Sequence, residues 1–190
     1  MAQDRAIEEF SDEASFEEWL AANHDSSPGI WLRIAKKGTG IPSVTYDEAL
    51  QVALRWGWID GQKRPQDEQY WLQGFGRRKA RSPWSKRNRE FAEKLIAGGR
   101  MQPSGLAEVE SARADGRWDR AYDSARAAEL PQDFLDAVRQ NPDAERALEQ
   151  LNRTNRYAIF YRIQDAKRPE TRERRIRTFV DMLARGEKLS

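Results

Sequence analysis

Strand-like patterns are confined to the first half of this 190-residue chain, and the second half shows helical patterns only. Apolar residues alternate from Ile30 to Ala35, with the period of a half-buried strand. Two more strands are predicted at residues 58–63 and 69–77, joined by a loop that fits a β-hairpin. Four helical segments follow, at residues 132–140, 142–151, 155–166 and 170–185. The sequence therefore predicts an α+β fold: a small antiparallel sheet with packed helices, then an all-helical domain.

The change of pattern also sets the predicted domain boundaries. Residues 1–122 form the α+β domain, and residues 131–190 form the helical domain. Between them, residues 123–130 lack clear periodicity and are interpreted as a linker. A chain of this length suits one large domain or two small ones. Seven Trp, seven Phe and five Tyr residues supply large buried areas for a core.

Charge is strongly segregated along the chain, although the net charge is only +2. Residues 1–27 contain eight acidic residues and one arginine, whereas residues 152–190 contain eleven Lys and Arg residues and five acids. This asymmetry favours an anionic partner or an intramolecular match between the two ends. The simpler alternative is that both segments are solvated helix faces.

Several classes of site and protein are excluded by composition. Without cysteine there is no disulfide framework, thiolate zinc site or cysteine nucleophile. The single histidine, His24, stands beside Asp25 in a segment read as a polar loop, so we expect neither a metal site nor a catalytic pair there, and no cofactor. No window approaches the ~20 apolar residues of a membrane span, and no export signal is evident. We expect a cytoplasmic protein without a membrane span.

Residues 56–88 concentrate aromatic and basic side chains and give the candidate site. Seven basic residues lie between Arg77 and Arg89 with no acid among them. A helix is predicted to begin at Ser82-Pro83, so its free amides and the preceding arginines would meet at one place and suit a phosphate or carboxylate. The predicted ligand-binding residues are Lys36, Lys37, Trp58, Asp60, Trp71, Gln73, Arg77, Arg78, Ser82, Trp84, Ser85 and Asn88.

Each part of this site has a simpler interpretation. Trp58, Trp71 and Phe75 also suit core positions of the sheet. Asp60 could pair with Arg77 or Arg78 merely to satisfy burial, and the arginine run also fits a solvated loop. The turn after Lys36 and Lys37 is glycine-rich, but it lacks the Walker pattern and also fits a plain connection. Asn88 falls within the apolar stripe of its helix, so its amide must bond either a neighbour or a ligand.

Basic residues gather again where the last predicted helix begins, at Lys167, Arg168, Thr171 and Arg172. Arg172 lies on the apolar face of that helix, one turn before Ile176. We interpret this group as an interdomain contact or as the second half of the same site. A plain helix start and a separate nucleic-acid surface are the alternatives.

Four motifs resemble the YdeI/OmpD-associated family of bacterial proteins, also described as bacteriocin-protection proteins. They are W-L-R-I-A-K-K-G-T-G-I-P-S-V-T-Y-D-E-A-L, W-G-W-I-D-G-Q-K, F-G-R-R-K-A-R-S-P-W-S-K-R-N and A-K-R-P-E-T-R-E-R-R-I. Residues 130–188 resemble the family's C-terminal helical domain, and residues 30–88 its common N-terminal region. The family commonly has proline where Gly76 stands here. The resemblance implies a role in tolerance of membrane-active antimicrobial peptides, some members being periplasmic, and brings no agreed molecular activity.

These observations favour a binding module for a small anionic ligand or a protein partner. Catalysis would require a base or nucleophile with an orienting partner. The candidates Asp60, Tyr70, Ser82 and Ser85 have neither a histidine nor metal ligands at a diagnostic spacing. Single-stranded nucleic-acid binding is the second interpretation, because segment 77–89 interleaves basic and aromatic residues. The acidic N-terminal segment and the near-zero net charge oppose it.

Overall fold

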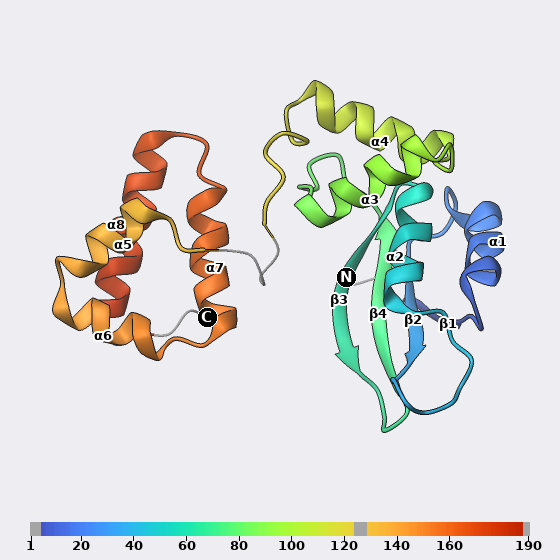
Figure 1. The fold of residues 1–190 in the computed structure, drawn as a ribbon, viewed down its shortest axis with the longest axis horizontal. Helices are drawn as coiled ribbons and strands as arrows, with labels where there is room; N and C mark the ends of the chain where they lie inside the picture. Colours follow the sequence, from blue (N-terminus) through green and yellow to red (C-terminus); the bar gives the residue numbers. More distant parts are fainter. Residues whose placement is uncertain (1–4, 124–128, 188–190) are drawn as a thin grey trace. The chain divides into compact units, whose positions relative to one another are not determined.

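A computed structural model describes residues 5–123 and 129–187, which divide into unit 1 (residues 1–121) and unit 2 (residues 122–190) (Figure 1). The predicted linker spans residues 123–130, of which residues 124–128 lie outside the described residues. Unit 1 contains a four-stranded sheet and helices, and unit 2 contains helices. The α+β prediction is therefore confirmed.

The sheet of unit 1 is built from β1 (Ala6–Glu9), β2 (Ile30–Ala35), β3 (Trp58–Pro65) and β4 (Tyr70–Arg77). The strand order is β1-β2-β4-β3, and the β3–β4 hairpin is antiparallel as predicted. Strand β1 instead pairs parallel to β2, so the sheet is mixed and the expectation of a purely antiparallel sheet was wrong. Its sequence, AIEE, has no extended alternation of apolar and polar residues to mark it as a strand.

Helices α1 (Glu13–Asn23) and α2 (Tyr46–Arg55) contribute to the core beside the sheet, and Figure 1 shows α2 lying along it. Helices α3 (Lys86–Ala97) and α4 (Pro103–Ala114) complete unit 1 near one end of the strands. The alternation predicted for β2 is confirmed, because its even-numbered residues are buried and its odd-numbered ones are half-buried. The largest fully buried side chains of this core are aromatic and include Phe16, Trp58, Phe75 and Trp84.

Helix starts show where the sequence was read correctly and where it was not. The capping box at Thr45 is confirmed, since its hydroxyl accepts from the Glu48 amide and the Glu48 carboxylate accepts from the Thr45 amide. Helix α3, however, begins at Lys86 with Ser85 as N-cap, rather than at Ser82. The Ser82 hydroxyl accepts from the Lys79 amide, 3.0 Å away, and so closes a turn before the helix.

One pair of acidic residues near the N-terminus is bridged by a single arginine inside unit 1. The Arg55 side chain, of which 8% is exposed, bridges the carboxylates of Glu13 and Glu17. This contact ties the end of α2 to α1, so part of the acidic charge of residues 1–27 serves the fold.

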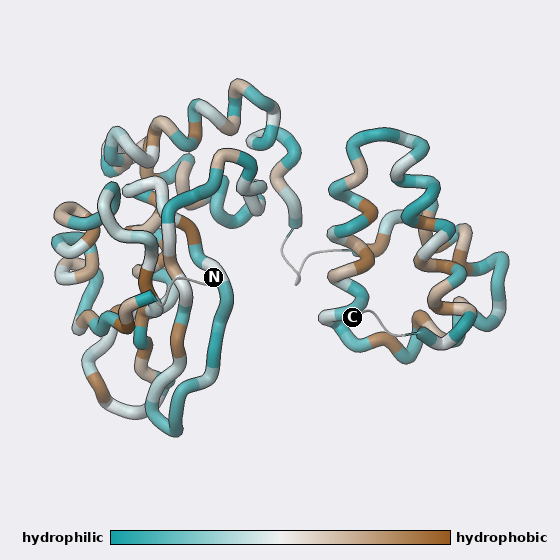
Figure 2. Tube along the Cα trace, turned by 180° about the vertical axis from the view of Figure 1, so that it is seen from behind, coloured by the Kyte–Doolittle hydropathy of each residue, from teal (hydrophilic) through white to brown (hydrophobic). Residues whose placement is uncertain are grey.

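Unit 2 contains α5 (Gln132–Arg139), α6 (Pro142–Gln150), α7 (Arg153–Gln164) and α8 (Pro169–Ala184). All four predicted helices are therefore present, with boundaries within two residues of those expected. They enclose an apolar cluster that includes Phe134, Ile159 and Phe179. Figure 2 shows apolar and polar residues alternating along these helices, as expected where one face of each helix is buried. No helix within the described ranges is long and apolar enough to cross a bilayer.

Candidate functional site

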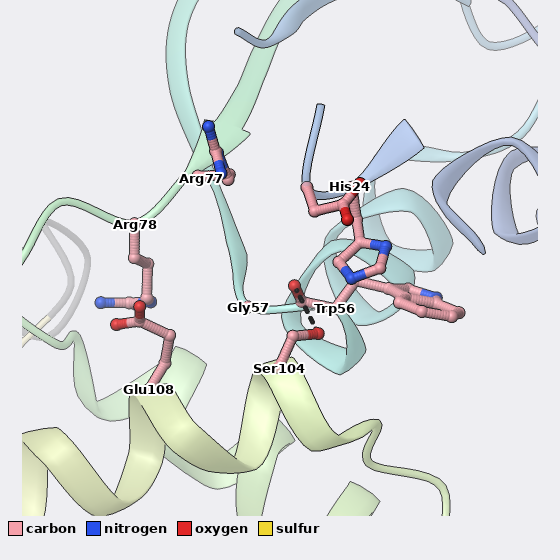
Figure 3. Close-up of a pocket in the computed structure, with 8 residues that line it drawn as sticks. His24, Trp56, Gly57, Arg77, Arg78, Ser104 and Glu108 are labelled. Atoms are coloured by element: carbon pink, nitrogen blue, oxygen red, sulfur yellow. Dashed lines mark hydrogen bonds between the residues drawn. The ribbon is translucent and has the colours of Figure 1, made fainter. Parts of the chain in front are cut away.

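Two predicted site residues, Arg77 and Arg78, line a hollow of about 320 Å³ in unit 1, called here the arginine pocket. Figure 3 shows the arginines at the end of β4, Ser104 and Glu108 rising from α4, and His24 approaching from another side. The lining residues are His24, Asp25, Trp56, Gly57, Arg77, Arg78, Ser104 and Glu108. Segments distant in sequence therefore meet at this pocket.

The turn between α2 and β3 joins these segments. The Ser104 hydroxyl donates to the Trp56 carbonyl over 3.1 Å, and the Arg78 amide donates to the Gly57 carbonyl over 3.2 Å. Gly57 has a φ of +75°, and a Cβ there would lie 2.9 Å from the Ser104 carbonyl oxygen. Only glycine fits both the left-handed backbone and this close approach of α4. The geometry of the pocket is thus fixed by backbone contacts.

Arg78 forms one wall and is largely buried, with 6% of the residue exposed. Its guanidinium lies 3.6 Å from the centre of the Trp84 ring and donates to the Pro83 carbonyl over 3.2 Å. Figure 3 shows the Glu108 carboxylate next to this guanidinium. Burial raises the pKa of Glu108, although the nearby charges of Arg78 and Arg117 oppose the shift. Glu108 therefore becomes neutral at a higher pH than an ordinary glutamate.

Arg77 differs from its neighbour because it is exposed. Within the described part of the chain its guanidinium forms no ion pair. An arginine presents five N–H donors in a planar fork that matches a carboxylate or a phosphate. Arg77 thus has donors available for a ligand.

His24 enters the pocket at the end of α1. Its Nδ1 lies 3.1 Å from the Leu20 carbonyl oxygen, which can only accept, so Nδ1 carries the hydrogen of this bond. In that tautomer Nε2 is the acceptor nitrogen of the ring. The ring packs against Trp56 at 4.7 Å, and the His24 carbonyl accepts from the buried Trp58 indole over 2.9 Å.

Sequence reasoning missed the partners of the two arginines. Residues 24 and 25 were set aside as a polar loop, yet His24 caps α1 and both line the pocket. Ser104 and Glu108 occupy unremarkable positions of a short helix, and no pattern links them to Arg77. The one available signal was that His24 is the only histidine in the chain.

Other predicted site residues lie in a separate hollow of about 580 Å³, called here the lysine hollow. It is lined by Lys36, Lys37, Lys63, Pro65 and Trp71. Trp71 and Arg77 are six residues apart on β4, which corresponds to roughly 20 Å along a strand. The single site predicted from sequence is thus divided between two ends of the hairpin.

Most of the remaining predicted site residues are buried or form hydrogen bonds within unit 1. The Gln73 amide donates to the Gly61 and Gln62 carbonyls at the irregularity in β3, over 2.9 and 3.3 Å. Asp60 accepts from the Tyr46 hydroxyl over 2.8 Å. Four others are also buried or hold local structure: Trp58, Trp84, Ser85 and Asn88. Their predicted role in ligand binding stays a prediction.

Comparison with family models assigns both regions. Residues 8–108 match a family described as a domain of unknown function (DUF8412). Residues 127–186 match the family described as Bacteriocin-protection, YdeI or OmpD-Associated. The chain belongs to the DUF8412 family and carries a YdeI/OmpD-associated C-terminal region. No curated protein and no solved structure matches it significantly.

The match over residues 127–186 confirms the resemblance to the YdeI/OmpD-associated family, whose description names bacteriocin protection, for the C-terminal region. Residues 30–88, which also resemble that family in sequence, fall instead within the DUF8412 match. The arginine pocket and the lysine hollow both lie in the DUF8412 region. No function accompanies that family's description. The chemistry of the pocket must therefore be inferred from its residues.

Within the YdeI/OmpD-associated region, the predicted basic group at the start of α8 is divided. Lys167, Arg168 and Thr171 line a shallow hollow of about 370 Å³. Arg172 instead donates to both carboxylate oxygens of Asp133, over 2.7 and 2.9 Å. This pair joins α8 to α5 and lowers the pKa of Asp133 through the hydrogen bonds from Arg172. The interdomain role of the group stays a prediction.

Proposed function

We propose that the DUF8412 region binds a small anionic ligand in the arginine pocket, in the setting of bacteriocin protection. The observation that carries the proposal is Arg77, an exposed guanidinium without an ion pair in the described chain, on the wall of a hollow beside Arg78. Its volume of about 320 Å³ is at the lower end for small-molecule sites. A phosphate or carboxylate would accept from the Arg77 fork.

Arg77→Ala is expected to weaken sulfate binding by about tenfold or more, because it removes the charged fork without touching the core. Titration calorimetry with sulfate measures this. Arg77→Lys keeps the charge but not the fork, so we expect an intermediate affinity. The matched control is Arg100→Ala, which removes an equally exposed charge elsewhere in unit 1. Equal losses for Arg77→Ala and Arg100→Ala would refute specific binding in the pocket.

Sulfate affinity is also expected to rise as the pH falls from about 8 to about 5. Glu108 faces Arg78 and Arg117, and shares the pocket with His24, Asp25 and Arg77. Because burial raises its pKa, Glu108 loses its negative charge at a higher pH than an ordinary glutamate does, and it then stops competing for the arginines. The charge of sulfate is constant over the range, so the change belongs to the protein. Glu108→Gln should bind sulfate more tightly at pH 8 and show a flatter pH profile; an unchanged profile would show that Glu108 does not govern it.

The contacts of segment 77–89 favour a small anion over single-stranded nucleic acid. Trp84 is buried beneath Arg78, so its ring is not offered to a base. Arg87 pairs with Asp47, and Arg89 pairs with Glu93 and bonds the Trp118 carbonyl. Several side chains that a nucleic-acid-binding surface would need are thus already engaged in contacts within unit 1. Nucleic-acid binding, a protein partner and a cytoplasmic location stay predictions from the sequence.

A further inference from the structure

The lysine hollow brings together three lysines from different segments of unit 1. Lys36 and Lys37 follow β2, while Lys63 lies on β3 beside the strand that carries Trp71. All three lysines are exposed. The hollow has a volume of about 580 Å³, which is well within the range of small-molecule sites.

No carboxylate lines this hollow among the residues that the structure describes. The nearest acidic side chain in sequence, Asp67, accepts from the amides of Gln69 and Tyr70 over 2.8 and 2.7 Å, and these bonds lower its pKa. Lys36 bonds the backbone carbonyl of Asp67 over 2.7 Å and not the carboxylate. Three ammonium groups therefore share one hollow without an acidic partner in it, an arrangement that an anion would stabilise.

An apolar platform lies within the same hollow. Trp71 and Pro65 are directly paired across β4 and β3, so their side chains stand on the same face of the sheet. The Lys63 ammonium lies 4.0 Å from the centre of the Trp71 ring. The Lys63 ammonium thus occupies the indole face on which a ligand ring would stack. Since Lys63 is exposed and has a flexible stem, it can move from the ring to a ligand's negative group.

We propose that the lysine hollow is a second ligand site, for an aromatic ring that bears a phosphate group, the chemistry of a mononucleotide. The ring would stack on Trp71 beside Pro65, and the phosphate would accept from Lys37, Lys63 and Lys36. This site is independent of the arginine pocket, because the two share no lining residue.

The test compares adenosine monophosphate with its two parts, adenosine and inorganic phosphate, by titration calorimetry. Because both the platform and the lysines contribute, adenosine monophosphate is expected to bind about tenfold or more tightly than either part. Lys37→Ala/Lys63→Ala should weaken it by about tenfold or more. Lys79→Ala/Lys94→Ala removes the same charge from exposed positions outside the hollow and should change affinity by less than about twofold.

A second readout locates the ring. Binding should shift the indole N–H resonance of Trp71, identified as the signal lost in Trp71→Phe. Equal affinity for phosphate and adenosine monophosphate would refute stacking of the ring on Trp71. Equal losses of affinity in the two double-lysine variants would mean that binding depends only on the overall charge of the protein. Loss of binding in Arg77→Ala, with both lysine pairs unaffected, would assign the ligand to the arginine pocket instead. Tighter binding of an oligonucleotide, weakened equally in both lysine pairs, would replace the site with an extended nucleic-acid surface.

Discussion

Gly105→Ala is expected to lower the free energy of unfolding of unit 1 by about 3 kcal/mol or more. Gly105 lies in the first turn of α4, where this helix crosses the end of α2. A Cβ at this position would lie 2.2 Å from the Arg55 carbonyl oxygen and 2.8 Å from that of Leu54. Both are backbone atoms of a helix, so no side-chain rotation can relieve the overlap. Chemical denaturation followed by circular dichroism measures the loss.

Gly61→Ala is the matched control for this substitution. Its Cβ would meet only the Gly74 carbonyl oxygen, at an ordinary 3.7 Å, so we expect a change within about 1 kcal/mol. Similar stability losses in both variants would indicate a general effect of removing glycine from unit 1. A native-like Gly105→Ala protein would mean that α4 can move away from α2, and the arginine pocket, which α4 lines, would then not be rigid.

Local signals predicted most elements of this fold. The alternation of β2, the hairpin and the Thr45 capping box each depend on residues close together in sequence, and each is confirmed. Strand β1 was missed because its short, polar sequence becomes a strand only by pairing with β2. The start of α3 was misplaced because Ser82 and Ser85 are both good N-caps, and the turn closed by Lys79 decides between them.

The candidate site was less predictable, for a physical reason. Charge and aromatic content drew attention to residues 56–88, and two arginines of that segment do line a pocket. Arg77 and Trp71 lie six residues apart on β4, which places them at different ends of the strand. The composition of the segment does not show this separation. Trp56 and Gly57 of the same segment line the pocket as well, and the other residues come from the end of α1 and from α4, which approaches through tertiary contacts such as the one at Gly57. Long-range packing, and not composition, selects the partners of Arg77.

Trp84 connects the core to the arginine pocket, and Trp84→Ala is expected to lower the free energy of unfolding by about 3–5 kcal/mol. Its side chain is 1% exposed and packs edge-on against Trp118, with ring centres 4.8 Å apart. The Arg78 guanidinium also lies 3.6 Å from the centre of the Trp84 ring. The same substitution therefore empties part of the core and removes the surface on which Arg78 rests.

Two milder substitutions separate these roles. Trp84→Phe keeps an aromatic face, and it gives up no hydrogen bond because the Trp84 indole nitrogen has no partner among the described residues. Trp84→Leu keeps apolar volume without an aromatic face. If the ring holds Arg78 for an anion, sulfate should bind Trp84→Leu several-fold more weakly than Trp84→Phe, while denaturation shows both to be folded. Equal sulfate affinities would confine Trp84 to the core; the proposed pocket would then stand on Arg77 alone, because an aromatic support that does not affect binding cannot be positioning Arg78 for the ligand.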